Sequence, residues 1–118
     1  MKRILVVDDE PGITEVLQGI LSDAGYQVVT ASDGRGAISE ATALPPDLVL
    51  LDFMMPVANG GDVLQTFRSH PDLQRVPVVL MSALDQVVVE GRAQGHAAFL
   101  RKPFRIDELL DVVAEHLH

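Results

Sequence analysis

Residues 48–60 of the chain read LVLLDFMMPVANG and combine a strand signal, an acid and the start of a helix. The four apolar residues 48–51 are typical of a strand buried on both faces of a parallel sheet. Asp52 follows this strand directly, and the apolar spacing after Asn59 predicts a helix that extends to about Ser69. The stretch therefore predicts one strand–helix unit with an acidic side chain where the strand ends.

The same order of a short apolar run and an amphipathic stretch occurs five times along the chain. The predicted strands are 4–7, 26–30, 48–51, 78–81 and 97–100, and the predicted helices are about 11–25, 33–43, 59–69, 85–95 and 106–113. Such alternation implies an α/β protein with a parallel sheet and helices on both faces. The strand order does not follow from periodicity, but ligands of such sheets bind beyond the carboxyl ends of the strands.

The composition limits the possible functions. A length of 118 residues suits one domain and is too short for two, so we expect residues 1–118 to form a single domain. The net charge of −8 disfavours binding of this domain to nucleic acid or to an anionic membrane. The absence of Cys excludes disulfides, thiol nucleophiles and Cys-based metal sites. No apolar run spans a bilayer and no signal-peptide pattern is present, so we expect a soluble, cytoplasmic protein.

Polar or charged side chains of interest follow four of the five predicted strands. Asp8 and Asp9 follow the first strand, Asp52 the third and Ser82 the fourth, and Lys102 comes shortly after the fifth. If the first and third strands are neighbours, three carboxylates converge, and they cannot all stay ionised cheaply without a cation. Mg²⁺ or Mn²⁺ is favoured, because the donors are oxygens and no Cys or nearby His is available.

These side chains suit phosphoryl chemistry. A carboxylate such as Asp52 can act as a nucleophile and form an aspartyl phosphate, while a metal ion, Lys102 and Ser82 stabilise the phosphoryl oxygens. The alternative for each residue alone is structural; Asp9, for example, could cap the helix that begins near Pro11. The joint placement at four strand ends favours the functional interpretation.

With these motifs in place, the chain resembles the receiver domain of bacterial two-component response regulators. The resemblance extends from ILVVDDE (4–10) through LVLLDFMMPVANGGDVL (48–64) and VVLMSA (78–83) to FLRKPF (99–104). It implies a flavodoxin-like, doubly wound (βα)5 three-layer sandwich whose five-stranded parallel sheet has the order 2-1-3-4-5. It also implies a phosphorylation-dependent switch that accepts a phosphoryl group from a histidine kinase or a histidine phosphotransfer protein.

The resemblance assigns separate roles to the acidic residues. Asp52 is expected to be the phospho-acceptor. Asp9 would bind Mg²⁺ directly, Asp8 would lie close by or act through water, and Asp52 and the backbone carbonyl of Met54 would complete the protein ligands. Such a domain is not a metabolic enzyme: its own chemistry would be Mg²⁺-dependent phosphorylation and slow autodephosphorylation.

The resemblance also assigns the residues that read the phosphoryl group. Ser82 would bond one phosphoryl oxygen, Lys102 would pair with the phosphoryl group, and the Lys102–Pro103 bond would be cis. The aromatic residue three positions before the lysine is Phe99, which would swing inward behind Ser82. Because Phe lacks the hydroxyl of the Tyr found in many relatives, this switch would act through packing alone.

Two variable positions of the family adjoin the expected site, and both are apolar here. Met54 lies two residues after Asp52, and Leu84 lies two residues after Ser82. Polar residues at these positions can place the water that hydrolyses the acyl phosphate. Their absence predicts slow autodephosphorylation.

The resemblance implies two partner surfaces. The exposed edge of the first helix, with the Pro103–Phe104 loop, would dock the histidine-bearing partner. The face formed by the fourth helix, fifth strand and fifth helix would contact a downstream protein or a second receiver. Val87–Val89 lie on this face, and at least one of these valines is expected to be exposed. Because these valines and Gly91 are poor helix formers, a displaced or partly unwound fourth helix is the alternative.

One rival function remains from the sequence: a receiver-like protein-interaction module that works without phosphorylation. Such modules usually lack the acceptor, an acid or the lysine, all of which this chain retains. We expect no output domain within residues 1–118. Four histidines without any partner spacing are expected on the surface: His70, His96, His116 and His118.

Overall fold

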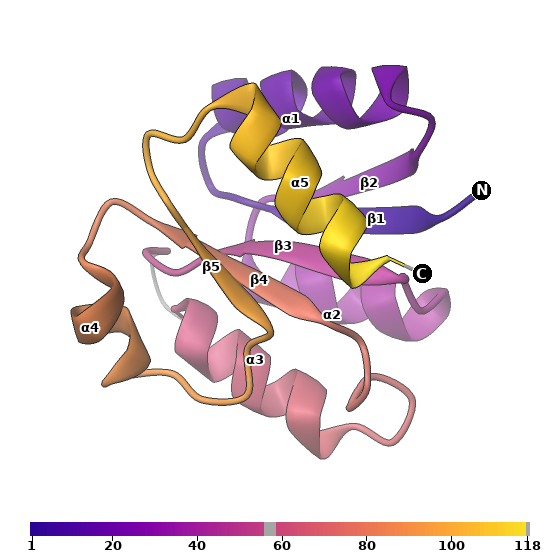
Figure 1. Cartoon of the computed structure of the whole chain (residues 1–118). Helices are drawn as coiled ribbons and strands as arrows, with labels where there is room; N and C mark the ends of the chain where they lie inside the picture. Colours follow the sequence, from indigo (N-terminus) through magenta and orange to yellow (C-terminus); the bar gives the residue numbers. More distant parts are fainter. Residues whose placement is uncertain (56–58, 118) are drawn as a thin grey trace.

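The computed structural model of the protein describes residues 1–55 and 59–117, and His118 lies outside them. Within these residues, strands and helices alternate along the chain (Figure 1). The strands are β1 (Arg3–Val7), β2 (Gln27–Ala31), β3 (Leu48–Asp52), β4 (Val78–Ser82) and β5 (Ala98–Arg101), and the helices are α1 (Pro11–Asp23), α2 (Gly34–Ala43), α3 (Gly60–Ser69), α4 (Gln86–Glu90) and α5 (Ile106–His116).

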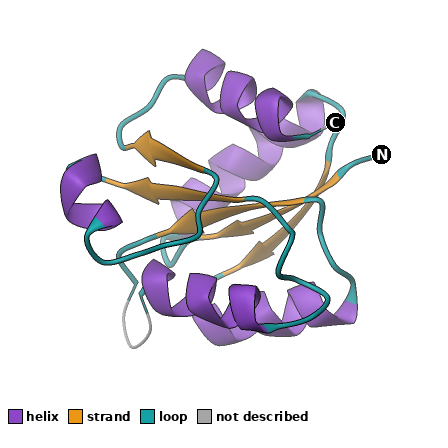
Figure 2. Cartoon of the chain, turned by 60° about the horizontal axis from the view of Figure 1, so that its bottom comes forward, coloured by secondary structure: helices purple, strands orange, loops and turns teal. Residues whose placement is uncertain are grey.

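The strands form one parallel sheet in the predicted order, β2-β1-β3-β4-β5. β1 pairs with β3 so that Val7 lies opposite Leu51, and β3 pairs with β4 so that Asp52 lies opposite Met81. α1 and α5 cover one face of the sheet, and α2, α3 and α4 cover the other (Figures 1 and 2). This arrangement confirms the flavodoxin-like three-layer fold and brings the ends of β1, β3 and β4 together.

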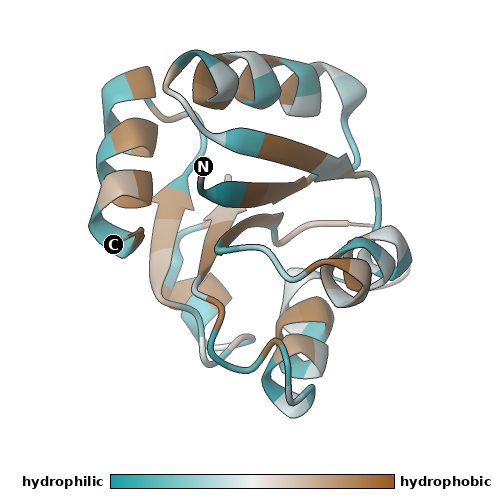
Figure 3. Cartoon of the chain, turned by 90° about the vertical axis from the view of Figure 1, so that its right-hand side faces the viewer, coloured by the Kyte–Doolittle hydropathy of each residue, from teal (hydrophilic) through white to brown (hydrophobic). Residues whose placement is uncertain are grey.

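Successive residues of the central strands point into two separate cores. Ile4 and Val6 of β1 pack with α1 and α5, whereas Leu5 and Val7 pack with α2 and α3. The inner strands are therefore apolar along nearly their whole length, while the helices are apolar on one side only (Figure 3). No helix among the described residues is both long and apolar enough to cross a membrane.

The start of α3 is fixed close to the end of β3. Asn59 caps the helix by accepting from the Asp62 N–H, and Asp62 accepts in return from the Asn59 N–H. A Cβ atom added at Gly60 would come within 2.8 Å of the Asp52 carbonyl oxygen and of the Phe53 Cα. Only glycine therefore allows this helix to begin so close to Asp52.

The fourth helix is shorter than predicted. α4 ends at Glu90 instead of continuing to about residue 95, so the prediction of a helix over 85–95 is wrong and the partly unwound alternative is closer. β-branched Val87–Val89 and then Gly91 give this segment low helix propensity. Val87 is 83% exposed and Val88 41%, whereas Val89 is fully buried, which confirms that at least one valine is exposed.

The prediction that the histidines lie on the surface is wrong for His96. Its side chain is only 13% exposed, and its Nε2 lies 3.6 Å from Glu90 Oε1 at the end of α4. His70 and His116 are half-buried as well. All three histidines lie at or beside the ends of helices, and their positions in the sequence do not indicate this burial.

Candidate functional site

Three carboxylates meet at the carboxyl ends of β1 and β3. One carboxylate oxygen from each of Asp8, Asp9 and Asp52 lies within 4.8 Å of the other two. Asp8 and Asp52 are buried, with 1% and 4% exposure, while Asp9 is exposed. The pairing of β1 with β3 causes this convergence, as the strand-end pattern predicts.

Lys102 reaches this acidic cluster from the segment after β5. Its Nζ lies 2.7 Å from Asp8 Oδ2 and 3.3 Å from Asp52 Oδ1. The Lys102 N–H donates to the Ser82 carbonyl at 2.8 Å, which fixes the lysine backbone beside the end of β4. The Lys102–Pro103 peptide bond is cis, as expected.

The electrostatics of the cluster favour a proton or a cation on Asp52. Burial raises the pKa of Asp52 to about 6, and the charge of Asp8 acts in the same direction, while Lys102 opposes both. For Lys102, burial lowers the pKa of the amine, but the hydrogen bond to Asp8 and the two carboxylate charges outweigh it, so the pKa is raised. The lysine therefore stays charged.

Ser82 is buried at the end of β4, next to the strand that carries Asp52. Its Oγ accepts a hydrogen bond from the Leu84 N–H at 3.1 Å. Because a hydroxyl can accept and donate at once, its proton is available for a further acceptor. The structure thus brings Ser82 to the same edge of the sheet as Asp52 and Lys102.

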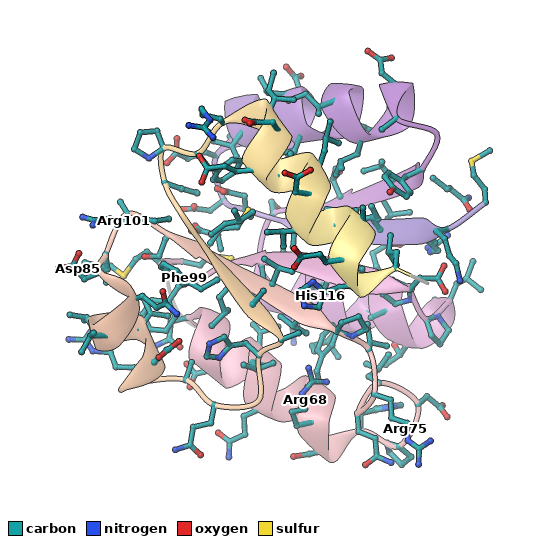
Figure 4. The ribbon with its side chains drawn as sticks, in the orientation of Figure 1. Arg68, Arg75, Asp85, Phe99, Arg101 and His116 are labelled. Atoms are coloured by element: carbon teal, nitrogen blue, oxygen red, sulfur yellow. The ribbon has the colours of Figure 1, made fainter. Side chains whose placement is uncertain are left out.

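The remaining predicted residues surround this edge without joining the cluster. Met54 is 55% exposed, and its role as a carbonyl ligand stays a prediction. Leu84 is half-buried against the core under α2 and α3. Phe99, labelled in Figure 4, is half-buried on β5 and packs against the same core, so its switch role also stays a prediction.

The structural alternative for Asp9 does not hold. The N-cap of α1 is Glu10, and no side chain caps this helix. Instead, Asp8 Oδ1 accepts from the Glu10 N–H at 3.0 Å, which orients the buried carboxylate. Asp9 is thus free to present its carboxylate beside Asp8 and Asp52.

These residues fit a hard divalent cation. The donors are all carboxylate oxygens, two of them buried and prearranged, and Lys102 supplies only one compensating charge. Mg²⁺ prefers oxygen ligands and retains several waters, for which exposed Asp9 leaves an open side.

A sequence model of one family, the response regulator receiver domain, matches residues 4–114 of this chain. The chain belongs to this family. Response regulator receiver domains are parts of two-component systems, interact with histidine kinases and downstream effectors, and bind Mg²⁺ at an acidic pocket. In this receiver domain the acidic pocket is the cluster of Asp8, Asp9 and Asp52.

Solved structures agree with the family. Chemotaxis protein CheY4 of Vibrio cholerae matches with a TM-score of 0.92 and 32% identity, and the match covers 99% of both chains. Response regulator TrrA of Thermotoga maritima, solved in complex with Mg²⁺-BeF, has a TM-score of 0.87 and 33% identity, covering 99% of this chain and 100% of TrrA.

Curated relatives are about twice as long as this receiver domain. DNA-binding response regulator MtrA of Mycolicibacterium smegmatis is 38% identical over 118 residues, which are 98% of this chain and 50% of MtrA. RpaA of Synechocystis, a DNA-binding transcriptional regulator, is 38% identical over 112 residues, which are 93% of this chain and 46% of RpaA. This chain thus spans about half the length of the curated relatives it matches.

One ion pair beside the site was not predicted from the sequence. Arg101 Nη1 lies 2.8 Å from Asp85 Oδ1, so an ion pair joins the end of β5 to the start of α4. A signal was present in the sequence, because β4 and β5 are adjacent, Arg101 is the last residue of β5, and Asp85 comes three residues after the end of β4.

Proposed function

We propose that Asp52 accepts the phosphoryl group and that this receiver domain is a phosphorylation-dependent signalling switch. The proposal is supported mainly by the position of Asp52, which is 4% exposed and lies beside two further carboxylates. Lys102 Nζ lies 3.3 Å from Asp52 Oδ1. A buried carboxylate with one cationic neighbour and one open side suits a nucleophile better than a helix cap.

The transfer step follows from this placement. A carboxylate oxygen of Asp52 attacks the phosphorus of a phosphohistidine or a small acyl phosphate, and the P–N or P–O bond breaks as the imidazole or carboxylate leaves. Lys102 moves from the Asp52 oxygen to a phosphoryl oxygen, while it retains Asp8. The Ser82 hydroxyl donates to another phosphoryl oxygen.

Asp8, Asp9 and Asp52, with the backbone carbonyl of Met54, would hold Mg²⁺, and Mn²⁺ would serve in its place. When bound, the cation neutralises negative charge on the phosphoryl oxygens. Asp8 would contribute to the cation site from its buried side, because Lys102 and the Glu10 N–H already orient its carboxylate. Asp9, which is exposed, would contribute from the side that faces the solvent.

The product is expected to be long-lived. Hydrolysis of the acyl phosphate needs a water aligned with the phosphorus, and the side chains of Met54 and Leu84 offer no polar atom for that task. Autodephosphorylation is therefore slow.

The histidine-bearing partner would dock in an apolar groove beside the site. The groove has a volume of about 410 Å³ and lies between α1 and the segment that leads from Lys102 into α5. Val16 and Ile106 are 60% and 57% exposed on its walls. An amphipathic helix that carries the phosphohistidine would bury these aliphatic side chains and present its ring to Asp52.

The α4–β5–α5 face would carry the output. Exposed Val87 and Val88 line a hollow of about 670 Å³ with Phe99. A downstream protein or a second receiver would cover this patch, whereas the net charge of −8 speaks against nucleic acid or a membrane as a partner of this domain. In this proposal residues 1–118 form a single receiver domain that works in the cytoplasm.

Intact mass measurement after incubation with acetyl phosphate tests the proposal. We expect one phosphoryl adduct with Mg²⁺, and none without Mg²⁺ or in Asp52→Asn. Asp72→Asn, which changes an exposed acid away from the site, is the matched control and keeps the adduct. A folded wild-type protein that forms no adduct would instead support an interaction module that works without phosphorylation.

A further inference from the structure

An ion pair connects the two segments that carry the phosphoryl-reading residues. Asp85 comes three residues after Ser82, and Arg101 directly precedes Lys102. The guanidinium of Arg101 lies 2.8 Å from the Asp85 carboxylate. Figure 4 shows both side chains at one corner of the molecule, next to Phe99, and all three line the same hollow.

Asp85 forms this pair at the expense of its own helix. It occupies the N-cap of α4, a position where Asp commonly accepts from the first backbone N–H groups, yet its side chain makes no capping hydrogen bond. The carboxylate is instead directed across to β5. The pair therefore connects two strand ends instead of stabilising one helix.

The loop between Ser82 and Asp85 is held at both ends. At its start, Ser82 Oγ accepts from the Leu84 N–H and the Ser82 carbonyl accepts from the Lys102 N–H. At its far end, Asp85 is anchored to Arg101. If Ser82 shifts to donate to a phosphoryl group on Asp52, as the proposed function requires, this short loop would move with it, and the movement would strain the Asp85–Arg101 contact.

We propose that Asp85 and Arg101 are positioning residues whose ion pair holds the loop after β4 in its unphosphorylated arrangement and thereby opposes the switch. The inference rests on the proposed function of Asp52. The two side chains are 67% and 62% exposed, so the pair is weak and breaks reversibly. It shifts the balance between two arrangements instead of locking one of them.

Titration with beryllium fluoride in the presence of Mg²⁺, followed by ¹⁹F NMR of the bound fluoride, tests the inference. Beryllium fluoride imitates a phosphoryl group on a carboxylate. We expect Arg101→Ala and Asp85→Ala each to lower the apparent dissociation constant about two- to five-fold, the range of a surface ion pair. The double variant should gain no more than either single variant, and the exchanged pair Asp85→Arg/Arg101→Asp should return to the wild-type value.

The direction of the two shifts and a control variant distinguish the effect of the ion pair from the effect of a changed net charge. Removal of a cation beside the site would weaken anion binding and removal of an acid would strengthen it, so a shift in the same direction for both variants identifies the pair. Arg105→Ala is the matched control: it removes another exposed arginine, whose ion pairs with Asp107 and Glu108 stay within one segment. It is expected to leave the dissociation constant unchanged.

A second readout needs neither Mg²⁺ nor fluoride. In the free protein, hydrogen exchange at the amides of α4 should be faster in Arg101→Ala than in wild type and unchanged in Arg105→Ala. Wild-type affinity in both single variants, or opposite shifts in the two, would overturn the inference alone. Failure of the folded wild type to bind beryllium fluoride would overturn the proposed function and the inference with it.

Discussion

At the residue scale, Asp52 combines burial with charge. Its carboxylate is 4% exposed, stands beside Asp8 and has Lys102 as its cationic neighbour, and the balance of these effects raises its pKa to about 6. An ionised Asp52 therefore lowers the stability of the folded protein at neutral pH. In the proposed function, binding of a cation or transfer of a phosphoryl group to Asp52 would remove this energetic cost.

This balance predicts that Asp52→Asn stabilises the metal-free protein. The folded state binds a proton on Asp52 between about pH 4 and pH 6 that the unfolded state has lost, so stability falls as pH rises through this window. Asparagine has no charge to bury. We expect the variant to exceed wild type by about 1–3 kcal/mol in the free energy of unfolding at pH 7.5, and the difference to shrink toward pH 4.

Urea unfolding at the two pH values, with a chelator present, measures this difference. Asp72→Asn should show no comparable pH-dependent gain, because Asp72 is exposed. A wild type at least as stable as Asp52→Asn at pH 7.5 would show that Lys102 compensates the buried charge in full.

At the element scale, the strand ends and the loop after β3 position the site. The order β2-β1-β3-β4-β5 places the ends of β1, β3 and β4 side by side, and Gly60 lets α3 start against the backbone of Asp52 and Phe53. The backbone of Asp52, the proposed acceptor, is thus packed closely against the start of α3.

Gly60→Ala is expected to destabilise the protein by about 1–3 kcal/mol, because the new methyl group overlaps backbone atoms that cannot move independently. Gly19→Ala is the matched control. Gly19 lies inside α1 with no atom within 4 Å of an added Cβ, so the same change should stabilise by about 0.5–1 kcal/mol. Thermal unfolding of both variants measures this; equal effects would contradict the close packing at Gly60.

The elements also show which features the sequence can predict. The local sequence pattern predicts uninterrupted apolar strands, such as residues 48–51, and the acids placed directly after them. It therefore also predicted the acidic cluster of Asp8, Asp9 and Asp52. The length of α4 could not be predicted, because Val87–Val89 have low helix propensity and tertiary contacts then decide where the helix ends. The Asp85–Arg101 pair depends on how two strand ends face one another, which periodicity does not contain.

At the scale of the whole molecule, the acidic site, the proposed partner groove and the proposed output face lie near the same end of the sheet. The segment from Lys102 into α5 borders the groove, while β5 and the start of α4 border the hollow around Phe99. A change at Lys102 is therefore next to both surfaces. The proposed switch needs no long-range path between input and output.

Cation binding should be visible as a gain in global stability. A ligand that binds only the folded state stabilises by about 1.4 kcal/mol at ten times its dissociation constant. We expect Mg²⁺ to raise the melting temperature of the wild type at pH 7.5 and to lose most of this effect in Asp9→Asn, where the exposed acid of the cluster is removed. An unchanged response in Asp9→Asn would remove Asp9 from the ligands.

The most direct test of the central claim is to locate the phosphoryl group. After reaction with acetyl phosphate and Mg²⁺, borohydride reduction converts an aspartyl phosphate to homoserine, which peptide mass spectrometry assigns to one position. We predict that the modified residue is Asp52 and that Asp8 and Asp9 remain intact. A modification on Asp8 or Asp9, or a phosphoryl group on a histidine, would contradict the role of Asp52 as the acceptor.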